Sequence, residues 1–374
     1  MSSQRSDRLS RALALSKSSE GRQKLASAGF EQLARLGSRF GSPMQKLSEV
    51  TDVPNLFTRE AVRVFATLGL PDLIASGISD IAELAERSEV DEDALARVAN
   101  HLVGAGILAS PTSGKVTWTP AGELLCSDHP ESQNLYFQLE GATARMEAAQ
   151  RDLLYSVRTG KPAYAHANGA EMWDQMAKQP ILTASFDAMM AEHALRIGPG
   201  FAENYDWLGI SQVADVGGGT GELLGQILRR FPSMRGILVE YADATVRAQK
   251  NIEKFGLSDR CRTVQCDFLE DALPPGADAY ILSWILHNWD DEHAKNILEN
   301  CRSAAGTNGR LLVIERPFDL TNDTYADLNM LAFFGGRERT RQELEALSKS
   351  AGLRPTSWTD ITAGCWVMEC VAAQ

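Results

Sequence analysis

The 374-residue chain lacks the features that would set it apart from ordinary globular proteins. No apolar run approaches the roughly 18 residues of a membrane span, and residues 1–7 contain no apolar segment typical of a secretory signal. We therefore expect a cytoplasmic protein without a membrane span. The chain also has no Cys-x-x-Cys pair and no paired histidines, which argues against zinc and against a disulfide framework. We expect no metal, and we interpret the six cysteines as buried or incidental thiols.

Basic residues are in deficit. The 37 Lys and Arg residues against 49 Asp and Glu residues give a net charge of −12, which disfavours nucleic acid as the main partner. The deficit is uneven, because residues 1–46 hold nine basic and three acidic residues and leave −18 on the rest. Three roles stay open for the basic arm (residues 1–45): docking on an acidic surface of its own dimer, which we favour, membrane contact, or partial disorder.

The most informative motif follows an apolar run that predicts a strand. Asp215, Gly217, Gly219 and Gly221 form the pattern Asp-x-Gly-x-Gly-x-Gly. Glycines let the backbone turn tightly and approach a ligand, and the helix predicted over 223–230 directs its N-terminus at the same place. A dinucleotide fingerprint requires a third glycine where this chain has a glutamate. The pattern therefore indicates S-adenosylmethionine (SAM) and disfavours NAD.

Two further strands end in residues suited to the same cofactor. The run 235–240 ends in Glu240, whose carboxylate can accept hydrogen bonds from both ribose hydroxyls. The run 261–266 is followed by Asp267 and Phe268, a carboxylate for the exocyclic amine of adenine and a ring to stack on it. Because ligands of open α/β sheets collect at the carboxyl ends of the strands, we expect these residues to converge on one crevice.

A fourth predicted strand leads into Ser283-Trp-Ile-Leu-His287-Asn-Trp, and a fifth ends in Glu315. Near the end of the chain stands Gly335-Gly-Arg-Glu338-Arg-Thr. Together these segments resemble the His-Asp-Trp and Gly-Gly-x-Glu-Arg-Thr signatures of the small-molecule O-methyltransferases typified by the caffeic acid and acetylserotonin enzymes. The resemblance is strong over residues 180–374 and mostly architectural over 45–180. It implies that His287 is the catalytic base and that Glu315 and Glu338 flank it.

The chemistry agrees with that resemblance. Methyl transfer from a sulfonium is an in-line displacement, so alignment of the nucleophile supplies much of the acceleration. A phenol must lose its proton first, and a histidine with an ordinary pKa near 6.5 can take it at neutral pH, helped by a neighbouring carboxylate. We interpret the other five histidines as surface or satisfied side chains: His101, His129, His166, His193 and His293.

The resemblance also implies the walls of an acceptor site. One face of a planar acceptor would be covered by Phe186 and Met190, on the helix predicted within 171–207. The opposite face is predicted to consist of Trp284, Met330, Phe333 and Phe334. So apolar a pocket does not suit a sugar or an amino acid. Ser283 replaces a lysine that many plant members place near the adenine, and Asn288 replaces the common aspartate beside the histidine, so a catechol-type acceptor does not carry over.

Residues 79–125 are predicted to form a winged helix, with helices over 81–85 and 93–108 and a wing strand at 115–119. This window has eight acidic and three basic residues, and such a surface repels phosphates. In the resembled family a module of this kind forms the dimer interface.

We therefore predict three parts: the basic arm (1–45), an all-α winged-helix dimerisation domain (46–180) and a doubly wound α/β SAM-binding catalytic domain of about seven strands (181–374). The predicted function is SAM-dependent O-methylation of a phenolic hydroxyl by a homodimer that binds no nucleic acid. Two alternatives stay open: a SAM-binding enzyme of the same fold that catalyses hydroxylation or a pericyclic reaction, and a SAM-sensing winged-helix regulator.

Overall fold

The computed structural model describes residues 56–362 and 364–373, which fall into two compact units, 56–137 and the described residues of 138–373. The predicted basic arm lies outside the described residues. The structure groups residues 138–180 with the second unit, whereas the sequence placed them with the first. The reason is packing, because apolar side chains of 142–182 share one core cluster with Phe333 near the C-terminus.

The first unit consists mainly of short helices. Their bounds, with those of two short strands, are α4 (Leu56–Thr67), α5 (Leu70–Ala75), α6 (Ile81–Arg87), α7 (Glu92–Gly104), β1 (Leu108–Ala109), β2 (Thr117–Trp118), η1 (Glu123–Leu125) and η2 (Leu135–Phe137). Asp80 and Asp91 cap α6 and α7 by accepting hydrogen bonds from backbone N–H groups of the first turn. The apolar faces of all these elements form one core.

Two sequence expectations for this unit were wrong in detail. The helix predicted over 93–108 ends at Gly104, because Gly106 adopts a left-handed conformation with φ of 76° and the chain then enters β1. The term all-α is also too narrow, since β1 and β2 pair antiparallel and Asp80 bridges to Lys115. The wing strand predicted at 115–119 is present as β2.

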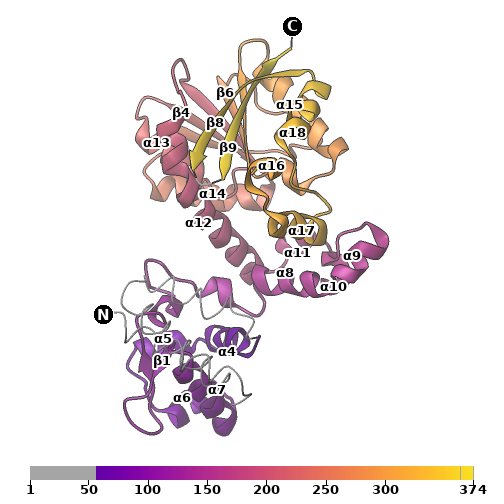
Figure 1. The fold of residues 1–374 in the computed structure, drawn as a ribbon. Coiled ribbons are helices and arrows are strands. Elements are labelled where there is room, and N and C mark those ends of the chain that lie inside the picture. Colours follow the sequence, from indigo (N-terminus) through magenta and orange to yellow (C-terminus); the bar gives the residue numbers. More distant parts are fainter. Residues whose placement is uncertain (1–55, 363, 374) are drawn as a thin grey trace, which may run out of the picture. The chain divides into compact units, whose positions relative to one another are not determined.

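The second unit contains a seven-stranded sheet with helices on both faces (Figure 1). Its strands are β3 (Gln212–Val216), β4 (Arg235–Glu240), β5 (Cys261–Gln265), β6 (Ala279–Ser283), β7 (Arg310–Glu315), β8 (Leu353–Thr362) and β9 (Cys365–Ala372), in the spatial order β5-β4-β3-β6-β7-β9-β8. The first five run parallel, and β9 and β8 form an antiparallel edge. This Rossmann-like α/β architecture confirms the predicted fold of the catalytic domain.

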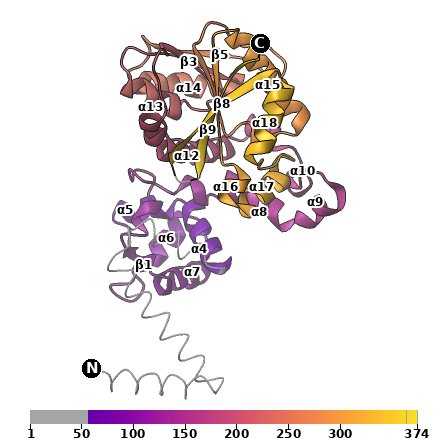
Figure 2. The ribbon, with the colours of Figure 1, turned by 45° about the horizontal axis from the view of Figure 1, so that its top comes forward.

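Helices cover the two faces of the sheet because successive strand side chains alternate. One face packs against α12 (Pro180–Asn204), α13 (Glu222–Arg230) and α14 (Ala242–Lys254), and the other against α15 (Asp291–Ala305) and α18 (Arg341–Ser350). Figure 2 shows these two layers from a second direction. The remaining elements are α8 (Ala142–Arg151), α9 (Leu153–Thr159), α10 (Tyr164–Asn168), α11 (Met172–Met176), η3 (Leu286–Asn288), α16 (Phe318–Thr321) and α17 (Thr324–Phe333). No helix among the described residues is long and apolar enough to cross a membrane.

Helix α12 approaches the sheet so closely that one of its glycines cannot carry a side chain. A Cβ on Gly200 would overlap the backbone carbonyl oxygen of Ile361 on β8. A Cβ on Gly198, half a turn away, would meet only the side-chain amide of Gln226, at 2.5 Å. The Ile361 carbonyl belongs to the backbone and cannot move aside, whereas the Gln226 side chain can rotate away.

We therefore expect Gly200→Ala to lower the free energy of unfolding by about 1–3 kcal/mol or more, since the backbone of α12 or β8 must move. Gly198→Ala is the matched control and should cost less. Chemical denaturation followed by tryptophan fluorescence measures both. Equal stability of the two variants would contradict the close approach of α12 to β8.

Candidate active site

The carboxyl ends of β3, β4 and β5 lie side by side and bring the predicted cofactor residues together. The Gly217 N–H donates to the carbonyl of Val239 at 2.9 Å, and the Cys266 N–H donates to the carbonyl of Glu240 at 3.0 Å. The glycine loop, Glu240 and Asp267 thus stand at one edge of the sheet. Ser283 ends β6, the neighbour of β3, and so belongs to the same edge.

The loop after β3 requires its glycines. Gly217, Gly219 and Gly221 have φ of 70°, 57° and 83°, a left-handed region that L side chains rarely adopt. A Cβ on Gly217 would also lie 2.5 Å from Cδ1 of Ile285. The loop turns directly into α13, so backbone N–H groups at the start of this helix face the same edge.

Two buried carboxylates accompany the glycine loop. Glu240 accepts hydrogen bonds from the N–H groups of Gly219 (3.0 Å) and Tyr241 (2.9 Å), and its burial raises its pKa. Asp215 is fully buried, neither of its carboxylate oxygens has a hydrogen-bond partner among the described residues, and burial together with the charge of Glu240 raises its pKa to about 7. Buried acceptors of this kind fit a ligand that carries hydroxyls and a cationic group, as SAM does.

Asp267 and Phe268 follow β5 at the same edge. The Asp267 carboxylate accepts from the Leu269 N–H (3.0 Å) and from the hydroxyl of Tyr241 (3.4 Å). The Phe268 ring is buried, and its centroid lies 4.9 Å from that of Tyr241. Sequence reasoning missed Tyr241, although its position directly after Glu240 was a usable signal.

The three predicted catalytic residues form one buried cluster. His287 Nδ1 lies 2.9 Å from Glu338 Oε1 and 3.7 Å from Glu315 Oε2. All three residues are buried, with 8% or less of the surface of each residue exposed. Because Nδ1 donates its proton to Glu338, Nε2 is the ring nitrogen that can accept a proton from a substrate. The carboxylates shift the pKa as well: burial alone would lower the pKa of His287, but attraction to Glu315 and Glu338 raises it above the usual value.

Glu315 also positions the segment that carries the histidine. Its Oε1 accepts from the backbone N–H groups of Leu286 (3.0 Å) and His287 (3.3 Å), and burial raises its pKa. On the other side of this segment, the Arg337 N–H donates to the carbonyl of His287 at 2.9 Å. Gly336 is required for this approach, because a Cβ there would overlap that carbonyl. Helix η3 is therefore held from both sides.

Arg339 is a further support that sequence reasoning missed, although it stands inside the Gly-Gly-x-Glu-Arg-Thr signature. Its buried guanidinium donates to the carbonyls of Leu286 (2.7 Å) and Trp289 (2.8 Å) and to the carboxylate of Asp291 (2.8 Å). Asp327 was missed too, and no sequence pattern marked it; its carboxylate accepts from the Glu338 N–H at 3.0 Å.

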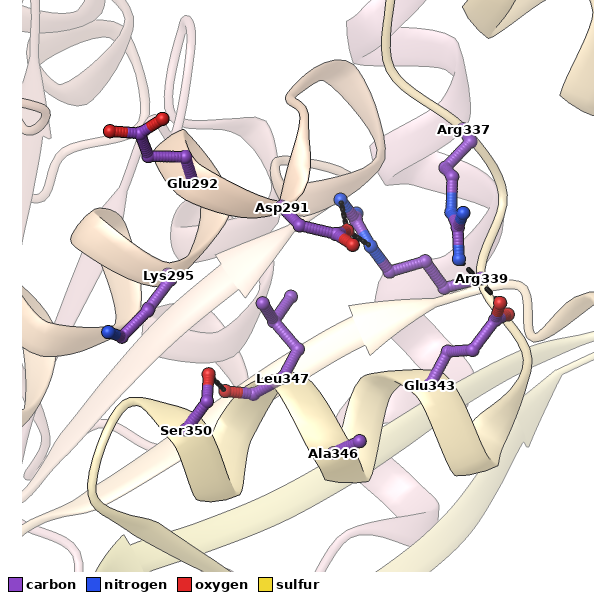
Figure 3. A pocket seen from close by; sticks show the side chains of 9 residues that line it. All are labelled: Asp291, Glu292, Lys295, Arg337, Arg339, Glu343, Ala346, Leu347 and Ser350. Atoms are coloured by element: carbon purple, nitrogen blue, oxygen red, sulfur yellow. Dashed lines mark hydrogen bonds and ion pairs between the residues drawn. The ribbon is translucent and has the colours of Figure 1, made fainter.

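Arg339 also lines a surface cavity of about 490 Å³ between α15 and α18 (Figure 3). Two ion pairs lie in its lining, Arg339 with Asp291 and Arg337 with Glu343. The cavity therefore belongs to the support behind His287 and not to the face where a substrate would react.

The predicted acceptor-binding residues fall into two groups. Trp284 and Asn288 lie beside His287: the ring centroids of Trp284 and His287 are 5.6 Å apart, and the Asn288 amide donates to the Trp284 carbonyl at 3.1 Å. The second group belongs to the cluster of α8, α10, α11, α12 and α17 and comprises Phe186, Phe333 and Phe334. The ring of Trp173 joins two of them, stacking on Phe334 and meeting Phe186 edge-on.

Met190 and Met330 take the positions that their helices dictate. Met190 is half-buried on α12, one turn beyond Phe186. Met330 is buried on α17, and its carbonyl accepts from the N–H groups of Phe334 and Gly335. Gly335 directly precedes Gly336, which lies against the carbonyl of His287. The C-terminal end of α17 is therefore linked through these two glycines to the backbone around His287.

The comparisons with known proteins identify one family. Residues 150–354, more than half of the chain, match the family model described as the O-methyltransferase domain. The chain is similar to the 2,7-dihydroxy-5-methyl-1-naphthoate 7-O-methyltransferase of Streptomyces carzinostaticus, at 38% identity over 80% of this chain and 90% of that protein. It is similar, at 40% identity over 84% of this chain and 87% of the other, to the aclacinomycin 10-hydroxylase of Streptomyces purpurascens.

Solved structures give the same result. An O-methyltransferase from neocarzinostatin biosynthesis, in complex with SAM and 2-hydroxy-5-methyl naphthoic acid, superposes with a TM-score of 0.76 at 36% identity. The alignment covers 86% of this chain and 98% of the other.

All six cysteines of the present chain are unpaired and buried.

The geometry of Glu240 yields a direct test of the cofactor site. We expect Glu240→Ala to weaken binding of S-adenosylhomocysteine (SAH) by about 1–3 kcal/mol, because ligand hydroxyls would lose a charged acceptor in a buried site. Calorimetry measures this, and Glu270→Ala is the control, since Glu270 is an exposed carboxylate near Asp267. Unchanged affinity in the Glu240 variant would place that carboxylate outside the cofactor site.

Proposed function

The chain belongs to the SAM-dependent O-methyltransferase family, and from this we propose that it methylates a phenolic hydroxyl of an aromatic natural product, with His287 as the general base. The observation that carries the proposal is the buried cluster in which Glu338 and Glu315 lie 2.9 Å and 3.7 Å from His287 Nδ1. The named naphthoate methyltransferase supports an aromatic acceptor.

In the proposed mechanism the chain aligns the acceptor and removes its proton. SAM supplies the electrophilic methyl group when it is bound. His287 takes the phenolic proton on Nε2, while Glu338 keeps Nδ1 protonated and holds the ring in orientation. The resulting imidazolium is stabilised by the nearby charge of Glu315. For the cofactor we propose Glu240 at the ribose, Asp267 and Phe268 at the adenine with Ser283 nearby, and the glycine loop and Asp215 at the methionine part.

For the acceptor we propose the two groups of side chains described above, with Trp284 and Asn288 near the reacting hydroxyl. Phe186, Met190, Met330, Phe333 and Phe334 would form the apolar walls. The cluster of His287, Glu315 and Glu338 also has the composition of a metal site, since its ligand atoms all lie within 4.8 Å of one another. We keep the metal-free proposal, because Nδ1 and Glu338 already share a hydrogen bond and Glu315 Oε1 holds two backbone N–H groups.

Hydroxylation is a second candidate because a relative at 40% identity carries that activity in its name. The same fold supports both reactions, so similarity of sequence alone does not decide between them. The complete set of base and flanking carboxylates favours methyl transfer. The regulator alternative loses its support, because every relative reported above is an enzyme.

The proposed base gives a kinetic prediction. We expect His287→Gln to reduce turnover about 10²- to 10⁴-fold with little change in SAH affinity, because the variant cannot accept a proton. The assay is transfer of labelled methyl from SAM to a panel of phenols, and dialysis of the wild type against EDTA is the control for a metal. A variant with near-normal turnover would exclude His287 as the base, and EDTA-sensitive activity would exclude the metal-free mechanism.

The raised pKa of His287 predicts the pH profile. Because the neutral form is the base, the wild-type rate should rise with pH through an ionisation above 6.5 and then level off. Glu338→Gln removes a negative partner, so its limb should move to lower pH while its maximal rate falls. Rates measured from pH 5 to 9 test this, and a limb that moves to higher pH would contradict the proposed role of Glu338.

We also propose that residues 56–137 belong to a winged-helix dimerisation domain, which the order of helices α5, α6 and α7 before the β1–β2 hairpin supports. The acidic surface of this region disfavours nucleic acid, as the sequence indicated. A cytoplasmic location stays a prediction. We expect a dimer of twice 40.8 kDa by sedimentation at micromolar concentration. A fully active monomer would refute the homodimer.

A further inference from the structure

Two aromatic rings that carry N–H donors lie beside the catalytic histidine. His193 lies on α12, and Trp284 lies between β6 and η3. Their rings stack on each other, and the Trp284 ring in turn lies 5.6 Å from that of His287, tilted by 49°. The sequence analysis interpreted His193 as a surface or satisfied residue. In the structure only 8% of its surface is exposed, and its Nε2 has no hydrogen-bond partner among the described residues, so neither description fits.

The tautomer of His193 follows from its neighbour. A guanidinium N–H of Arg196 donates to His193 Nδ1 at 3.1 Å, so Nδ1 is an acceptor and the ring proton is on Nε2. Burial first, and then the positive charge of Arg196, lower the pKa of His193 to about 3, so the ring is neutral at working pH. Nε2 is buried and donates to no group of the described chain.

Trp284 also carries a buried N–H group without an acceptor in the described part of the chain. Its indole Nε1–H is buried and has no acceptor among residues 56–362 and 364–373. Its backbone has φ of 56°, a strained conformation for a bulky residue, and is held there because its N–H donates to Ile314 (3.0 Å) and its carbonyl accepts from Asn288 (3.1 Å). Strain and unsatisfied buried donors concentrate at binding sites, because a ligand satisfies them.

We propose that the N–H groups of His193 and Trp284 form a subsite for a carbonyl or carboxylate oxygen that neighbours the reacting hydroxyl of the acceptor. This inference rests on the proposed function and narrows its substrate class to phenols with an ortho carboxylate or an adjacent ring carbonyl. Both groups are donors only, so they select an acceptor oxygen. The positive charge of Arg196 behind His193 favours an oxygen that bears negative charge. The ring centroids of Trp284 and His287 lie 5.6 Å apart, so an acceptor whose hydroxyl faces His287 would bring a neighbouring substituent close to Trp284.

The test measures binding to the enzyme–SAH complex by calorimetry, with 1-hydroxy-2-naphthoate and 1-naphthol as a matched pair. The wild type should prefer the naphthoate at least about tenfold. His193→Phe keeps a ring and removes the donor, so this preference should largely disappear, whereas His193→Gln, which retains an N–H, should restore part of it. His293→Phe is the control, because that histidine is exposed on the same unit, where its ring pairs with Asp290 and stacks on Trp289.

Two kinds of result would contradict the proposed subsite. An equal preference in wild type and His193→Phe, or no preference in the wild type, would overturn it. A loss of SAH affinity with the preference intact would assign His193 to the cofactor and overturn it as well. If His193→Phe does not fold, Trp284→Phe removes the other donor and takes its place. Failure of the proposed function would be seen separately, as absence of methyl transfer by the wild type, because the binding measurement needs no turnover.

Discussion

The active site depends on burying a histidine between two carboxylates. Removing charged groups from water is costly, and a cluster of this kind is stable only if each group finds partners inside the protein. Glu338 shares a hydrogen bond with His287, and one oxygen of Glu315 accepts from two backbone N–H groups. Glu315 Oε2 and His287 Nε2 are the atoms of these two side chains that these hydrogen bonds leave available to a substrate.

That requirement explains structure well outside the cluster. Glu315 reaches the histidine segment because β6 and β7 are neighbouring parallel strands, and Glu338 reaches it because Gly336 lets its loop touch the carbonyl of His287. Arg339 closes the arrangement from behind by holding the carbonyls on both sides of the histidine. Each contact fixes backbone around η3, so the position of Nε2 follows from rigid neighbours and not from one side chain.

The cofactor edge works by a different principle. Parallel strands end together, so residues far apart in sequence meet there without any special contact. The same scaffold serves a methyltransferase and a hydroxylase among the named relatives, and the chemistry therefore depends on the side chains at this edge and on what the acceptor presents to them. Trp284, whose φ is 56° and whose ring lies beside that of His287, is one side chain through which such a difference could act.

The sequence determined the features that are local in the chain. The spacing of Gly217, Gly219 and Gly221 specified a turn whose left-handed backbone favours glycine, and the apolar runs before Glu240 and Glu315 predicted strands that the structure confirms. The predicted identities of base and carboxylates came from motifs in which each residue is marked by its neighbours. The end of α7, the grouping of 138–180 with the second unit, and the roles of Arg339, Asp327 and His193 came only from the tertiary structure. These features depend on burial and on partners distant in sequence. The sequence around His193, for example, does not reveal that its ring is buried against Trp284 or that its Nε2 proton has no acceptor among the described residues.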